Sequence, residues 1–322
     1  MMNKETINIG IIIRMATSLI PLFLGMPTIA TILCAYNIAM SFVVLGPVNS
    51  IFSGIGAVII SALFGGIMMQ GGETYGLVIG IEAVLCASGV IYSIVKKTGF
   101  FRGVWLASAG YLVPSFVYTY ISATKSGQSV VSYLVSEPVK MLSEGIKPVL
   151  ESTATGAIEL EEIIEIVQKV STMIIPSVFI ISSIFVGYVT MWSVNTALKK
   201  APFGYKHSFA SLKMPKSAVS ILIVVFVLNL FVDSNLEYIF TNMFVILSGM
   251  CFFSGLSLVE HLLRRKFKNL FVRIIIHFVI YAILSVLIPF LPYILIGVID
   301  SFADFRKITR KKKEDAAVET EK

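Results

Sequence analysis

The stretch from Met15 to Gly72 contains 58 residues without a single Asp, Glu, Lys, Arg or His. Water-soluble domains do not contain such stretches, because about a quarter of their residues are normally charged. A helix needs only about 20 apolar residues to cross the hydrocarbon core of a bilayer. The stretch is therefore long enough for more than two membrane-spanning helices, with breaks at Gly25-Met26-Pro27 and at Gly46-Pro47.

The composition of the whole chain agrees with this interpretation. Of its 322 residues, 56% are hydrophobic and only 14% are charged. We predict an all-α fold, a polytopic transmembrane helical bundle of about 8–10 spans with an external amphipathic helical segment. The net charge of +7 comes from basic residues at the ends of apolar segments, as in membrane topology signals, so the lipid bilayer is expected as a partner and nucleic acid is not.

Charge patterning divides the chain into four expected regions. Residues 1–122 form an N-terminal transmembrane sub-bundle of about five spans, the first of them at Ile7–Leu24. Residues 123–172 form an extracytoplasmic acidic amphipathic segment, with seven glutamates against four lysines. Residues 173–304 form a C-terminal sub-bundle of about four to five spans, and residues 305–322 form a charged cytoplasmic tail. The positive-inside rule then places both termini in the cytoplasm.

The segment Leu270–Asp304 is too long for one upright span. Its 35 residues would make a continuous helix of roughly 52 Å. Pro289 and Pro292 interrupt it, and basic clusters flank both of its ends. A hairpin of two short helices satisfies these constraints, and a single kinked span is the alternative.

Small residues recur at four-residue spacing in three consecutive predicted helices, which favours close helix packing in lipid. The three ladders are Ser53, Ala57, Ser61 and Gly65; Gly72, Gly76 and Gly80; and Gly99, Gly103 and Ala107.

Glu82 is the most informative single residue, because it lies about two turns inside an apolar helix. An intramembrane carboxylate usually faces a cavity, a partner or a proton path. The candidate substrate-binding residues are Glu82, Gly76, Gly80 and Asn37. The alternative is that the Glu82 carboxylate has a structural role and that amide side chains such as Asn37 form hydrogen bonds between neighbouring helices.

A second group of charges lies near the end of the last apolar segment. Asp300 and Asp304 are four residues apart and Arg306 follows them. Carboxylates at a helix C-terminus oppose the helix dipole, which suggests a compensating partner. We predict a structural ionic latch of Asp300, Asp304, Arg306 and Arg264, with the aspartates paired to Arg264, Arg265 or Arg273. A solvated charged boundary is the alternative.

Enzymatic motifs are missing from the sequence. It contains no GxxxxGK[ST], HExxH or GxSxG pattern, and its three histidines and three cysteines are scattered. We therefore predict no enzyme activity, no catalytic residues, no metal site and no cofactor.

The segment SGLSLVEHLLRRK, followed by an apolar run and GVIDSFADFRK, resembles the C-terminal signature of the YybS-like family of predicted bacterial multi-pass membrane proteins, a domain of unknown function. The resemblance is carried by Gly255, His261, Gly297, Asp300, Asp304, Phe305 and Arg306. It implies a protein of the bacterial cell (plasma) membrane and supplies no catalytic residues. The family is also distantly similar to the membrane-embedded solute-binding components of energy-coupled vitamin transporters.

Two functions follow as hypotheses. In the first, the chain is a solute-binding or permease-like component of membrane transport, which binds a small-molecule solute and depends on a membrane protein partner, an ATPase or an ion gradient. In the second, it is a structural or assembly factor of the cell envelope that recruits partners through its cytoplasmic and external loops.

Overall fold

The computed structural model describes residues 14, 17–23, 26–68, 72–136, 139, 140, 144, 160–198, 208–232, 235–284 and 290–306. In these ranges the structure contains ten bounded α-helices, one short 3-10 helix and a further helical stretch at 130–136, without strands. Six of the helices are long and apolar enough to cross a membrane. The predicted all-α transmembrane fold is confirmed, and the chain is an integral multi-pass membrane protein.

The total number of membrane passes stays a prediction. Besides the six long helices, the described ranges contain three shorter apolar helices, at Lys216–Asn229, Leu270–Ile283 and Leu291–Ala303. Most of the predicted first span and most of residues 137–159 lie outside the described residues, as does the tail beyond Arg306.

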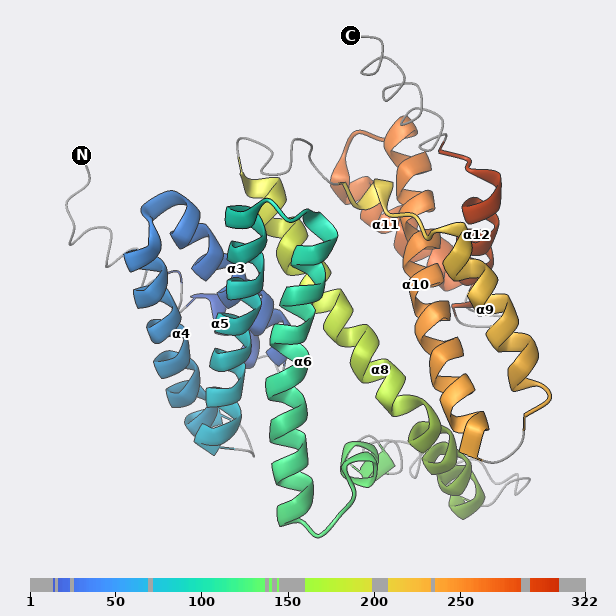
Figure 1. Ribbon diagram of the computed structural model, residues 1–322, viewed down its shortest axis with the longest axis horizontal. Helices are drawn as coiled ribbons and strands as arrows, with labels where there is room; N and C mark the ends of the chain where they lie inside the picture. Colours follow the sequence, from blue (N-terminus) through green and yellow to red (C-terminus); the bar gives the residue numbers. More distant parts are fainter. Residues whose placement is uncertain are drawn as a thin grey trace. The chain divides into compact units, whose positions relative to one another are not determined.

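The helices fall into two units, Met1–His207 and Ser208–Lys322 (Figure 1). The first unit contains α2 (Ile20–Phe23), α3 (Pro27–Leu45), α4 (Pro47–Met68), α5 (Gly72–Lys96), α6 (Phe100–Lys125) and α8 (Leu160–Ala197). The second contains η1 (Phe209–Ser211), α9 (Lys216–Asn229), α10 (Asn235–Lys266), α11 (Leu270–Leu284) and α12 (Leu291–Ala303).

Helix α8 belongs to the first unit, with the N-terminal helices. It packs on α6 and α3. At Gly187 the backbone of α8 comes so close to α6 that a Cβ atom would lie 2.6 Å from the carbonyl oxygen of Val104. The division of the chain at residues 123–172 stays a prediction.

Two of the three predicted ladders of small residues meet between α4 and α5, which run side by side in Figure 1. A Cβ atom at Gly76 would collide with the Ser61 carbonyl oxygen and lie 2.9 Å from the Cα of Gly65. One at Gly80 would lie 2.6 Å from the Cα of Val58. Glycine is needed at both positions because the backbones themselves are in contact.

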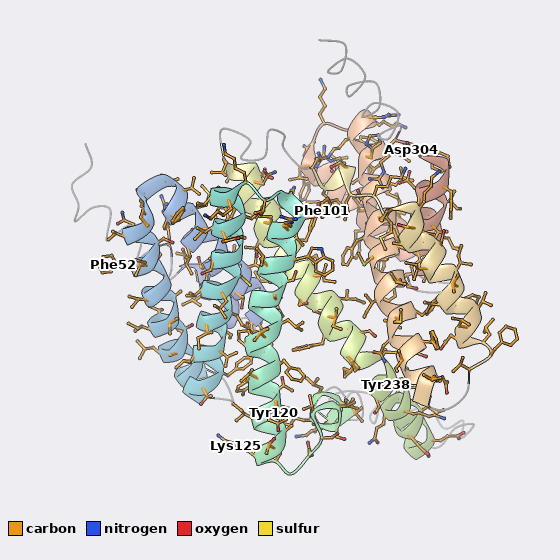
Figure 2. All side chains as sticks on the ribbon, viewed as in Figure 1. Phe52, Phe101, Tyr120, Lys125, Tyr238 and Asp304 are labelled. Carbon is orange, nitrogen blue, oxygen red and sulfur yellow. The ribbon has the colours of Figure 1, made fainter. Side chains whose placement is uncertain are left out.

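The outer faces of these helices carry large apolar side chains. About half or more of the surface is exposed for Phe52 on α4 and for Phe101 and Tyr120 on α6. Figure 2 shows Phe52 on the outer side of its helix. Such side chains suit contact with lipid tails, as expected for membrane-spanning helices.

In the second unit, α10 and α12 meet through a reciprocal pair of glycines. A Cβ atom at Gly255 would collide with the Tyr293 carbonyl oxygen, and one at Gly297 would collide with the Cys251 carbonyl oxygen. In the last apolar segment the described residues form two helices, α11 and α12, and Pro292 lies in the first turn of α12. Whether they make one or two passes stays a prediction. With 13 residues, α12 is shorter than the roughly 20 residues of a full span.

The α4–α5 interface provides a direct test. Gly76→Ala should lower the free energy of unfolding by about 1–3 kcal/mol, because the added methyl group forces the two backbones apart. The measurement is thermal or denaturant unfolding in detergent.

Gly56→Ala is the matched control, because a Cβ atom there meets nothing within 4 Å. It should leave the stability unchanged or raise it by up to about 1 kcal/mol. Equal stabilities of the two variants would contradict the described interface.

Candidate functional site

Glu82 lies in the middle of α5 and is buried, with only 6% of its surface exposed. Its Oε2 atom accepts a hydrogen bond of 3.2 Å from the hydroxyl of Thr31 on α3. Its Oε1 atom accepts a hydrogen bond from the hydroxyl of Ser115 on α6. Three helices therefore converge on one carboxylate.

Further hydroxyl groups surround this carboxylate. Tyr111 lies one helical turn before Ser115 on α6. Tyr75 lies seven residues before Glu82, on the same face of α5, and its ring centroid is 5.5 Å from that of Tyr118 on α6. We call this group the Glu82 cluster; its members are Thr31, Tyr75, Glu82, Tyr111, Ser115 and Tyr118.

Glu82 has no ion pair with any basic side chain in the described ranges. Neutral hydroxyl groups can orient an ionised carboxylate but do not compensate its charge, and burial of an uncompensated charge is costly. No described residue supplies a compensating positive charge, and protonation of the carboxyl group would remove the need for one.

The structure separates the other candidate substrate residues from this cluster. Gly76 and Gly80 face α4, whereas Glu82 faces α3 and α6. Each residue turns an α-helix by about 100°, so Glu82 lies about 200° around the axis from Gly80. The amide of Asn37 donates a hydrogen bond to the Ser18 hydroxyl. A substrate role for Gly76, Gly80 and Asn37 stays a prediction, and their contacts are those of helix packing.

A groove of about 740 Å³ lies elsewhere in the first unit, along α3, α4 and α5. Its lining is largely apolar, with Phe42, Ile55 and Val84 among the contributing residues and Lys96 at one end. None of the four candidate substrate residues lines it. A surface of this kind suits lipid chains better than a polar solute.

The second unit holds a fully buried ion pair between Arg306 and Asp300, at 2.9 Å and with both side chains 0% exposed. The same guanidinium donates to the carbonyl oxygens of Ala210, Leu212 and Ser254, at 2.9, 2.7 and 2.9 Å. Arg306 thus joins the chain segment before α9 to α10 and to the end of α12. Burial lowers the pKa of Arg306, and the neighbouring Asp300 carboxylate opposes this shift.

The pairing predicted for the ionic latch was wrong in its partners. Asp300 pairs with Arg306, and Asp304 pairs with Lys213 at 2.6 Å. Figure 2 shows Asp304 at the end of α12. Arg264 and Arg273, the expected partners, instead contact Glu260 at 2.6 and 3.3 Å.

Glu260 is therefore a functional candidate that the sequence interpretation missed. It accepts from Arg264 one turn later on α10, and its Oε2 atom lies 3.3 Å from His277 on α11. The four-residue spacing of Glu260 and Arg264 was the available signal, since such pairs face each other on a helix. Thr31 and Ser115 gave no comparable signal, because hydroxyl residues are common in membrane helices.

The described residues were considered next as possible metal ligands. Within the described ranges, no group of three or more His, Cys, Asp or Glu side chains could hold a metal ion.

Comparison with known proteins gives one result. Residues 8–301 match the profile of a family described as "Predicted membrane protein (DUF2232)". The chain has no significant match among curated proteins or among solved structures.

The buried ion pair can be tested by Asp300→Asn. This change leaves the Arg306 guanidinium buried without its counter-charge, and the free energy of unfolding should fall by about 3–5 kcal/mol. Detergent melting of the purified variant is the measurement.

Asp304→Asn serves as the comparison, because its pair with Lys213 is less deeply buried than the Asp300–Arg306 pair and should contribute less to stability. Asp304 has a φ of 49°, a conformation that asparagine also adopts readily. Similar losses in both variants would argue against a special role for Arg306.

Proposed function

The chain belongs to the DUF2232 family of predicted membrane proteins, and from this premise we propose that it is a solute-binding or permease-like component of membrane transport. The family match confirms the resemblance read from the C-terminal segment. It assigns no activity, so the proposal depends on the site.

The observation that carries the proposal is a buried carboxylate inside a membrane-embedded bundle without a basic partner in the described ranges. A carboxylate kept only for stability is normally neutralised by a nearby cation, as Glu260 and Asp300 are in the second unit. Glu82 instead has neutral donors from two neighbouring helices. Such an arrangement suits a site that exchanges a positive group or a proton.

The chemistry of the cluster favours a small solute with a cationic or donor-rich group. Glu82 supplies the acceptor, and Thr31, Tyr111 and Ser115 supply hydroxyl groups that donate or accept. Nearby tyrosine rings add apolar surface and a face that attracts cations.

Transport also needs a source of energy. Because the sequence contains no Walker motif, we assign this role to a partner ATPase or to an ion gradient. Lysine and arginine residues lie between α5 and α6 and at the end of α10, and they support a cytoplasmic location for these helix ends.

The test is native mass spectrometry of the gently solubilised protein. The expected result is a small molecule that co-purifies with the wild type and is reduced at least about tenfold in Glu82→Gln, because removal of one charged hydrogen-bond acceptor typically costs more than 1.4 kcal/mol.

Ser53→Ala is the matched control, since it removes a buried hydroxyl of the same unit, which donates a hydrogen bond of 3.0 Å to the Ser41 hydroxyl and lies outside the Glu82 cluster. It should retain the solute. A solute kept equally by Glu82→Gln and the wild type would overturn the proposal, and a stoichiometric protein partner without any solute would favour the assembly hypothesis.

A further inference from the structure

One carboxylate in the second unit is shared by three basic side chains. Glu260, on α10, lies 2.6 Å from Arg264, 3.3 Å from Arg273 and 3.3 Å from His277. Arg273 also donates to the carbonyl oxygens of Phe267 and Lys268, at 3.2 and 3.3 Å. The arginine therefore fixes the turn between α10 and α11.

This turn carries a surplus of positive charge. Residues 256–277 contain five basic residues and one acidic residue, a net charge of +4 with histidine neutral. Arg265, Lys266 and Lys268 are exposed and form no ion pair with a carboxylate of the described ranges. We call the five basic residues the basic turn; they are Arg264, Arg265, Lys266, Lys268 and Arg273.

An exposed apolar stripe on α11 lies next to the basic turn. Arg273 and His277 lie on the face of α11 that meets Glu260. Phe271, Ile274 and Phe278 lie on another stripe of this helix and are 68%, 55% and 72% exposed. Positive charge and an exposed apolar stripe thus follow each other along one short helix.

We propose that the basic turn binds the headgroup of an anionic phospholipid, whose acyl chains lie along the exposed stripe of α11. The basic turn follows directly on a membrane-spanning helix, so it lies at the level where lipid phosphates are found. Guanidinium and ammonium groups are the usual protein ligands of phosphate. The proposal uses no residue of the Glu82 cluster, so the two hypotheses stand or fall separately.

The ion pairs of Glu260 fix part of the proposed lipid site. By holding Arg264 and Arg273, Glu260 fixes two of the cations relative to the helix axes, while the three exposed ones remain available to a ligand. A merely topological cluster of positive charge requires no such fixation.

The experiment compares lipid retention by the full chain. Wild-type protein is placed in nanodiscs of equal amounts of phosphatidylglycerol and phosphatidylcholine, released into the gas phase, and its retained lipids are counted by native mass spectrometry. We expect phosphatidylglycerol to be retained preferentially, and the triple variant Arg265→Gln/Lys266→Gln/Lys268→Gln to retain it about tenfold less, because each basic residue near the surface attracts anionic lipid.

The matched control removes three exposed positive charges elsewhere in the chain, by Lys97→Gln/Arg102→Gln/Lys216→Gln. It should retain phosphatidylglycerol as the wild type does. Equal losses in both triple variants would show non-specific attraction and overturn the proposal, as would equal retention of the two lipids by the wild type.

A second readout needs no variant. Retention of phosphatidylglycerol by the wild type should fall as the salt concentration rises, because exposed charges are screened. Retention that does not depend on salt would overturn the proposal even if the triple variant failed to fold.

Discussion

The structure depends on close contact between helix backbones at small residues. Lipid tails are as apolar as leucine, so no hydrophobic effect brings membrane helices together, and van der Waals packing has to do so. Gly76 and Gly80 provide this contact between α4 and α5, as Gly255 and Gly297 do between α10 and α12. In the first unit the contact also fixes the rotation of α5, and thereby directs Glu82 away from α4.

Buried carboxylates have different kinds of partner in the two units. In the second unit every buried carboxylate of the described ranges has a basic partner: Glu260 has arginines and a histidine, and Asp300 has Arg306. In the first unit Glu82 has neutral hydroxyl partners. Ion pairs between fixed side chains make a permanent connection, whereas a carboxylate among hydroxyl groups can change its partner.

The sequence predicted what depends on local patterns. Apolar length predicted the membrane-spanning helices, proline predicted the break between α11 and α12, and four-residue spacing predicted the contact of α4 with α5. It did not predict partners that approach through space. The pairing of Asp300 with Arg306 depends on a turn with positive φ at Asp304, and the pairing of Arg273 with Glu260 depends on the direction of α11. Thr31 and Ser115 were missed for the same reason, since 51 and 33 residues separate them from Glu82.

The contacts of Arg306 have a consequence for biosynthesis. Its partners Ala210, Leu212 and Ser254 all precede it, and Ser254 does so by about 50 residues. At about 5–20 residues per second, the ribosome needs about 3–10 s to add that many residues. During this interval the segment before α9 and the Ser254 part of α10 have been synthesised, but the side chain that connects them to the end of α12 does not yet exist. Closure of the second unit is therefore a late step of membrane insertion, timed by the position of one arginine in the chain.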